Sequence, residues 1–289
     1  MKKSTSNSRS LASLAGWDFK AVKRFNHYLA NYETLPSYKK VLSTMIKFKE
    51  MYQPIRKSST YIDPFGSLAS INEERKLKRI QIFMNKRDII KTFDETRGKR
   101  FIVTSRGHKI FYKDYPLARL RKIKWNGLWT IVMYDFPEKL RILRNLIRRK
   151  LKSLGFGSPQ LSVLISPLPI NEGIHKLIEG ERMSEFVWTL RAKKVLGMED
   201  REVARKSWPL DEINRLYKDL LEILPKAKKA PNKPELLESW KRYFLSLNHA
   251  DPYLPFELLP KDWVGEACEN EFVKLGWAGS FRLILKKLP

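Results

Sequence analysis

Apolar residues near the start of the chain recur at helical spacing in two stretches: Val22, Phe25 and Leu29, then Val41, Met45 and Phe48. Leu35-Pro36-Ser37 separates the two stretches. Proline ends a preceding helix and suits the first turn of the next one. The pattern therefore predicts two helices between residues 17 and 52, and the Pro- and Ser-containing segment 53–70 predicts a loop.

A third helix is predicted over residues 72–84, because Leu77, Ile80 and Met84 share one face and basic residues lie mainly around the others. Residues 89–93 and 101–104 then have strand character, and they flank a polar turn over 94–100. Residues 105–109 follow as a turn that leads into a short amphipathic stretch. This is the element order of a winged helix-turn-helix, whose helix enters the major groove while the hairpin contacts an adjacent groove or the backbone.

The centre of the chain predicts a small α/β sandwich. Residues 128–134 are almost continuously apolar, as in a strand of a covered sheet. A basic helix over 139–154 stops at Gly155, and strands at 160–165 and 186–190 flank a short helix at 174–178. This β-α-β-β-α-β pattern indicates a ferredoxin-like fold.

The C-terminal third predicts helices over 208–224 and 234–247, separated by a Lys/Pro-rich loop at 225–234. Proline and tryptophan are dense after residue 251, which indicates a rigid loop held against a core. We therefore expect an α+β multidomain protein. Its predicted parts are a flexible basic arm (1–14), a winged helix-turn-helix domain (15–124), a ferredoxin-like domain (125–205) and a small helical domain (206–289).

Charge separates these parts further. The chain has 57 Lys and Arg against 31 Asp and Glu, a net charge of +26. Residues 1–125 hold 29 of the basic and 10 of the acidic residues, a net of +19. A surplus of that size repels itself unless a polyanion lies against it. The N-terminal part is therefore predicted to bind nucleic acid.

Several other classes of protein lack support. Cys268 is the only cysteine and the four histidines are scattered, so neither a disulfide within the chain nor a zinc-finger spacing exists. No secretory signal, membrane-length apolar run, phosphate loop, dinucleotide fingerprint or Ser/His/Asp order is present. We expect a protein of the prokaryotic cytoplasm, associated with the nucleoid, that is not an enzyme, needs no cofactor and does not bind membranes.

The predicted DNA-contacting residues are basic positions of the third helix and of the hairpin region. On the helix they are Arg75, Lys76, Lys78, Arg79 and Lys86, and at the wing they are Arg97, Lys99, Arg100 and Arg106. A solvated helix face is the alternative for each basic run. RNA is a second alternative, because a basic patch alone does not distinguish it from DNA. The absence of an aromatic RNA-binding motif favours double-stranded DNA.

The helix over 139–154 carries a second basic stripe. Arg141, Arg144, Arg148 and Lys152 are spaced as one face, which suits either contact with the DNA backbone or a solvated outer face. Most other conspicuous residues have structural interpretations. His108 is predicted to lie in a turn and Cys268 in a buried helix, while the tryptophans are predicted as core residues: Trp208, Trp240, Trp263 and Trp277.

Two stretches of the sequence resemble a known family. The C-terminal signature comprises Trp208, Leu210-Asp211-Glu212-Ile213-Asn214, Tyr217, Asp251-Pro252, Leu254-Pro255, Leu258-Leu259-Pro260, Trp263 and Gly265. The central signature runs from Trp129 through Tyr134-Asp135-Phe136-Pro137-Glu138 to Leu154-Gly155-Phe156 and Ser162-Val163. Both resemble the PaaX family of bacterial repressors, and the central one is also similar to the small ferredoxin-like nuclease subunit of CRISPR adaptation.

This resemblance implies a homodimeric winged-helix repressor that binds a pseudo-palindromic operator. In the best-known branch of the family an aryl-acyl coenzyme A thioester releases the repressor, so an acyl-CoA-like effector is implied as well. The alternative is a metal-dependent nuclease or a CRISPR-adaptation-like subunit. In that case Asp135, after the first strand of the central domain, would hold Mg²⁺. Against it, Asp135-x-x-Glu138 with Pro137 has the pattern of a capping box, which favours a structural role for Asp135.

Overall fold

The computed structural model describes residues 19–51, 71–95, 98–122, 124–169, 183–193 and 197–275. It contains helices and two antiparallel sheets, which confirms the α+β class. The chain divides into two compact units, of which the first comprises Met1–Phe111, Ile213–Ala250 and Val264–Pro289, and the second Tyr112–Glu212 and Asp251–Trp263. The predicted arm 1–14, the loop at 53–70 and the helix at 174–178 lie outside the described residues. The predicted domain boundaries stay predictions.

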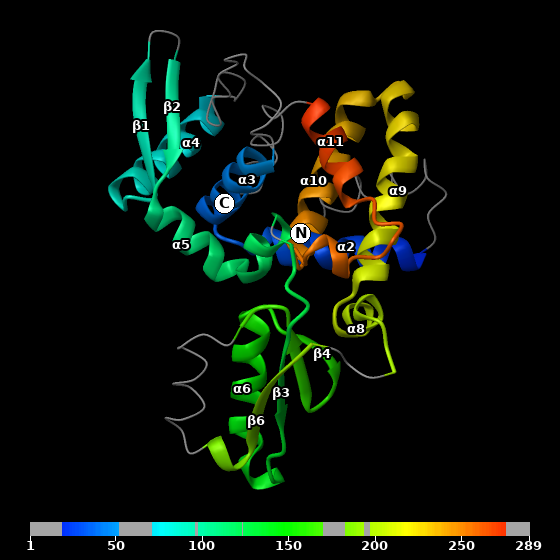
Figure 1. Ribbon diagram of the computed structural model, residues 1–289. Coiled ribbons are helices and arrows are strands. Elements are labelled where there is room, and N and C mark those ends of the chain that lie inside the picture. The colour runs from blue at the N-terminus through cyan, green and yellow to red at the C-terminus, as the bar shows by residue number, and fades with distance from the viewer. Residues whose placement is uncertain are drawn as a thin grey trace. The chain divides into compact units, whose positions relative to one another are not determined.

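The first unit combines helices from both ends of the sequence (Figure 1). Helices α2 (Phe19–Glu33) and α3 (Ser37–Met51) lie on either side of Pro36, as predicted. Helix α2 packs on α10 (Lys233–Ala250): the ring centroids of Phe25 and Tyr243 are 5.0 Å apart, and Arg242 Nη2 lies 2.6 Å from Glu33 Oε1.

A third helix and a hairpin belong to the same unit. Helix α4 (Ile71–Lys86) is followed by β1 (Ile90–Glu95) and β2 (Gly98–Val103), which pair antiparallel with Glu95 opposite Gly98. The hairpin turn is therefore shorter than the predicted segment 94–100, most of which extends the two strands. The side chains of Asn85 in α4 and Thr92 in β1 exchange hydrogen bonds of 2.9 and 3.2 Å, which fix the hairpin to the helix.

Residues 105–109 form the start of a helix, α5 (Ser105–Asp114), so the prediction that His108 lies in a turn was wrong. Thr104 Oγ1 accepts a hydrogen bond of 3.1 Å from the Gly107 N–H and caps the first turn. A Cβ atom at Gly107 would lie 2.4 Å from the carbonyl oxygen of Ile89. Glycine at this position therefore permits close packing of α5 against residue 89, and does not mark a turn.

The second unit contains a four-stranded sheet of β3 (Trp129–Tyr134), β4 (Gly157–Gln160), β5 (Val163–Ser166) and β6 (Val187–Ala192). The strand order is β4-β5-β3-β6 and every neighbouring pair is antiparallel. This is the order of the predicted ferredoxin-like sheet. The predicted single strand at 160–165 was wrong, because Leu161 and Ser162 form a turn between β4 and β5.

Helix α6 (Arg141–Ser153) packs Ile147 and Leu151 against Val132 and Tyr134 of β3. The predicted capping box before it is not formed. A short 3₁₀ helix, η2 (Glu138–Leu140), precedes α6. The N-cap residues are Pro137 for η2 and Leu140 for α6, and neither makes a capping hydrogen bond with its side chain. The physical reason is Pro137, which disfavours a helical conformation at the preceding Phe136, so Asp135 lies too early in the chain to cap the helix.

The C-terminal third is helical, as predicted, with three differences. Helix α8 (Asp200–Ser207) was not predicted, α9 (Leu210–Lys229) continues through Pro225, and the Lys/Pro-rich loop shortens to residues 230–232. Helix α11 (Gly265–Lys274) buries Cys268 completely. Trp208 and Trp240 are buried and Trp263 is half-buried, which agrees with a core role, while Trp277 lies outside the described residues. Among the helices described, none is long and apolar enough to cross a membrane.

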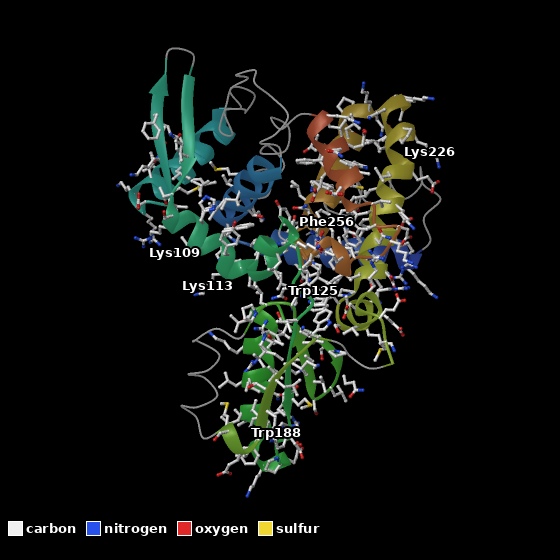
Figure 2. The ribbon with its side chains drawn as sticks, in the orientation of Figure 1. Lys109, Lys113, Trp125, Trp188, Lys226 and Phe256 are labelled. Carbon is white, nitrogen blue, oxygen red and sulfur yellow. The ribbon has the colours of Figure 1, made fainter. Side chains whose placement is uncertain are left out.

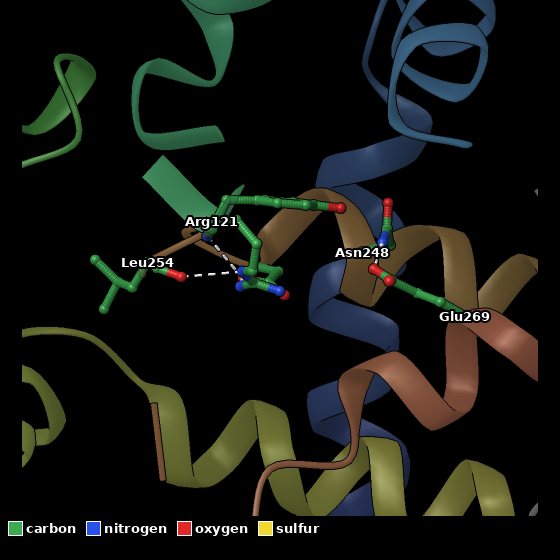
Figure 3. A network of polar contacts seen from close by, with 6 residues as sticks. Arg121, Asn248, Leu254 and Glu269 are labelled. Atoms are coloured by element: carbon green, nitrogen blue, oxygen red, sulfur yellow. Dashed lines mark hydrogen bonds and ion pairs between the residues drawn. The ribbon is translucent and has the colours of Figure 1, made fainter. Parts of the chain in front are cut away.

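A buried ion pair lies within the second unit. Arg121, in the 3₁₀ helix η1 (Pro116–Lys122), donates to Asp251 Oδ1 at 2.7 Å and to the Leu254 carbonyl oxygen at 3.0 Å (Figure 3). Its guanidinium carbon is 4.7 Å from the ring centroid of Tyr253 and 5.9 Å from that of Trp263. The pair therefore holds η1 against the 251–263 segment.

Candidate nucleic-acid interface

Helix α4 has one apolar and one basic face. Met84 is fully buried, and the Phe83 ring lies 5.1 Å from that of Tyr38 in α3. Lys78, Arg79 and Lys86 are exposed, and the spacing of residues 79, 82 and 86 places Arg79 and Lys86 on one face with Ile82, which is 45% exposed. The three lysine and arginine side chains are thus accessible to a partner, and their contact with DNA stays a prediction.

The remaining predicted contacts are only partly described. Arg75 and Lys76 lie in α4, and Lys99 and Arg100 in β2, but the structure describes the backbone and not the side chains at these four positions. Arg97 lies outside the described residues. On β1, Lys91 is exposed and Phe93 pairs in register with Arg100. Lys91 was not among the predicted contacts.

Arg106, which was predicted to lie at the wing, lies in the first turn of α5. Lys109 and Lys113 follow it at helical spacing on α5 (Figure 2), and all three side chains are exposed according to their accessible surface. The sequence-based prediction missed both lysines, because the start of this helix was interpreted as a turn. Their signal was the spacing of residues 106, 109 and 113, which places them on one helix face. Arg87, at the end of α4, was also missed, and its guanidinium lies 4.5 Å from the ring centroid of Phe83.

Among the described residues, these exposed basic side chains have no acidic partners. In the described part of the chain, no ion pair or hydrogen bond joins an acidic residue to any of eight residues: Lys78, Arg79, Lys86, Arg87, Lys91, Arg106, Lys109 and Lys113. Solvent ions that gather at such exposed basic side chains can be displaced by a polyanion.

The second predicted stripe, on α6, is less uniform. Arg141 and Lys152 are exposed, but Arg144 is half-buried and its Nη1 lies 3.2 Å from Glu138 Oε2. Arg148 is half-buried, and its Nε is enclosed without a hydrogen-bond partner among the described residues. Burial raises the pKa of the neighbouring Tyr134 hydroxyl, and the charges of Arg148 and Arg144 oppose that shift. Two of the four stripe residues thus lie partly inside the unit.

Asp135 lies at the end of β3 with an exposed side chain, and its backbone N–H donates to the Phe186 carbonyl oxygen at 2.8 Å. Within the described ranges, no group of three or more His, Cys, Asp or Glu residues is placed to hold a metal ion.

Known proteins match two consecutive parts of the chain. Residues 122–204, which include the sheet and the first part of α8, match the central Cas2-like domain of PaaX proteins. Residues 208–280, which include α9, α10 and α11, match the PaaX-like C-terminal domain. The chain belongs to the PaaX family.

One curated PaaX relative is the transcriptional repressor PaaX of Escherichia coli (strain K12). It is 23% identical over 228 residues, which cover 71% of this chain and 70% of the relative. Among solved structures, the uncharacterized protein Rv0674 from Mycobacterium tuberculosis is 20% identical, with a TM-score of 0.41 over 74% of this chain and 85% of that one. The two PaaX family matches begin at residues 122 and 208, so they do not include α4, the hairpin or α5.

Proposed function

We propose that this chain is a sequence-specific, DNA-binding transcriptional repressor. The observation that carries the proposal is a group of exposed basic residues on α4 and beside it that have no acidic partner among the described residues. They belong to a member of the PaaX family whose E. coli relative is a transcriptional repressor. In this proposal α4 is the recognition helix and the β1–β2 hairpin is the wing of a winged helix-turn-helix.

The local geometry supports those roles. Helix α4 immediately precedes the hairpin, and the Asn85–Thr92 hydrogen bonds join the two elements. The inner face of α4 packs on α3 through Phe83 and Tyr38, so the helix has a fixed support. A rigid helix with exposed Lys78, Arg79 and Lys86 can enter a major groove, where bases are distinguished by hydrogen bonding.

The family resemblance extends the proposal to partners. A homodimer would place two such helices on a pseudo-palindromic operator, and an acyl-CoA-like effector would release it. The repressor would act in the cytoplasm. On this proposal the protein is not an enzyme and needs no cofactor.

Selection of genomic DNA fragments by the purified protein tests the function. Enrichment of one discrete motif, bound more tightly than duplex RNA or scrambled DNA of equal length, is the expected result. Uniform recovery of fragments that vanishes with added salt would contradict a sequence-specific repressor. Preferred binding of duplex RNA would contradict the choice of DNA.

A second candidate function is a metal-dependent nuclease that uses Asp135. Its support is the exposed Asp135 carboxylate, which does not cap α6. Incubation of the protein and of Asp135→Ala with DNA or RNA and Mg²⁺ separates the two functions. Cleavage by the parent protein that the variant loses would establish the nuclease and overturn a purely regulatory role.

A further inference from the structure

Helix α5 carries a basic stripe that needs its own explanation. Its members are Arg106, Lys109 and Lys113, all exposed and all without an acidic partner in the described part of the chain. Figure 2 shows Lys109 and Lys113 extending from the same helix. The stripe lies beyond the hairpin in sequence, so it belongs to neither the recognition helix nor the wing.

Helix stability does not account for the whole stripe. The amino end of a helix has a partial positive charge, so a cation there is unfavourable by about 0.3–1 kcal/mol. Arg106 occupies that first turn, which contains no acidic residue. Lys113 in the last turn is favourable for the helix, whereas Lys109 in the middle gains little from the dipole. A role outside the helix explains Arg106 and Lys109 better than a role in folding.

The start of α5 is held close to the end of α4. The Thr104 N–H donates to the Ile89 carbonyl oxygen at 3.0 Å, and Thr104 Oγ1 donates to the same oxygen at 3.1 Å. Gly107 packs directly on that carbonyl group. Arg106 therefore lies close to the segment that follows Lys86, the last residue of α4, and Arg87.

We propose that Arg106, Lys109 and Lys113 form a separate contact with the phosphate backbone of duplex DNA. This inference rests on the proposed function and extends it, because it assigns to α5 a footprint outside α4 and the hairpin. Lysines on a helix surface bind phosphates as point charges and carry no sequence information. The α5 contact would add affinity equally on any duplex and leave the choice of operator to α4.

The test measures duplex binding by fluorescence anisotropy at several salt concentrations. The variant Lys109→Ala/Lys113→Ala removes two stripe charges, and Lys229→Ala/Lys233→Ala removes two exposed lysines at the α9–α10 connection as a matched control. Each lost phosphate contact lowers the slope of log affinity against log salt by about 0.9, so the stripe variant should lose about 1.8. Its affinity should fall by the same factor on operator and on scrambled DNA, while the control keeps the wild-type slope.

If the wild-type protein binds DNA and the stripe variant has the same salt slope as the control variant, the proposed function is unaffected and the α5 contact is overturned. Loss of discrimination between operator and scrambled DNA would also overturn it, since it would assign base reading to α5. Absence of salt-dependent duplex binding by the wild-type protein would instead overturn the proposed function. Thermal unfolding of both variants verifies that each remains folded.

Discussion

Basic residues in two regions of this protein have opposite surroundings. On α4, β1 and α5, exposed lysines and arginines have no acidic partner in the described structure. Between residues 200 and 275 many are paired: Lys206 with Glu202 at 3.3 Å, Arg205 with Asp211 at 2.9 Å and Lys228 with Glu271 at 2.9 Å. Hydrogen bonds from Lys274 and Lys228 lower the pKa of Glu271. One region therefore stabilises its charge within the protein, and the contrast motivates the proposal that the other region binds a polyanion.

The largest expected effect on folding is at the buried pair of the second unit. Arg121→Met would leave the Asp251 side chain, only 1% exposed, without its cation. Breaking a buried pair in this way costs about 3–5 kcal/mol of unfolding free energy, measured by urea denaturation. Arg205→Met, which breaks the exposed pair with Asp211, is the control and should cost at most about 1 kcal/mol. Equal losses in the two variants would contradict the structural role of Arg121.

The largest expected effect on binding is at α4. Lys78→Glu/Arg79→Glu should weaken operator binding on the order of 100-fold, because each reversed contact costs about 1–3 kcal/mol. Its thermal stability should stay within the range of other surface substitutions. Lys229→Glu/Lys233→Glu makes the same charge change at the α9–α10 connection and should change affinity only slightly. If both variants bound equally weakly, net charge and not the α4 surface would govern binding.

Gly107→Ala tests how α5 is joined to residue 89. Its Cβ would lie 2.4 Å from the Ile89 carbonyl oxygen and 2.6 Å from Val103 Cγ1. Because a backbone carbonyl group cannot move freely, we expect a loss of about 1–3 kcal/mol in unfolding free energy. Ser105→Ala, at an exposed neighbouring position, is the control. A stabilised Gly107→Ala variant would show that α5 packs less closely than described.

The smallest expected effect is at Asp135. Loss of a helix cap costs about 1 kcal/mol, but Asp135 makes no capping bond to η2 or α6. Asp135→Ala should therefore change the unfolding free energy by less than about 0.5 kcal/mol, as surface substitutions usually do. DNA affinity should be unchanged. A loss of a full kilocalorie or more in urea denaturation would restore the capping role that the sequence suggested.

Much of the fold could be predicted from apolar spacing. Helices α2, α3, α4 and α10 and strands β3 and β6 are close to their predicted positions. Apolar residues recur at helical spacing in α2, α3 and α4, and β3 and β6 are short apolar runs. The errors arose where a local signal was overridden by packing. Gly107 suggested a turn but permits close contact of a helix, and Pro225 suggested a helix end but lies exposed within α9.

The candidate site was harder to predict in full. The basic residues of α4 were found because their helix was found, whereas Lys109 and Lys113 were missed together with the start of α5. The absence of acidic partners was also beyond the sequence, since Glu138 and Arg144 show that a charge can be matched by a residue several positions away. Ion pairs of this kind depend on the conformation of the chain, and the amino-acid composition does not determine that conformation.

Lysine reactivity in the presence and absence of operator DNA tests the comparison most directly. The complex would be treated with an acetylating reagent and the modified positions identified by mass spectrometry. We predict that DNA protects Lys78, Lys86, Lys91, Lys109 and Lys113, while Lys206, Lys226, Lys229 and Lys233 keep their reactivity. Equal protection of both groups, or protection of the second group alone, would contradict the assignment of DNA binding to α4, the hairpin and α5.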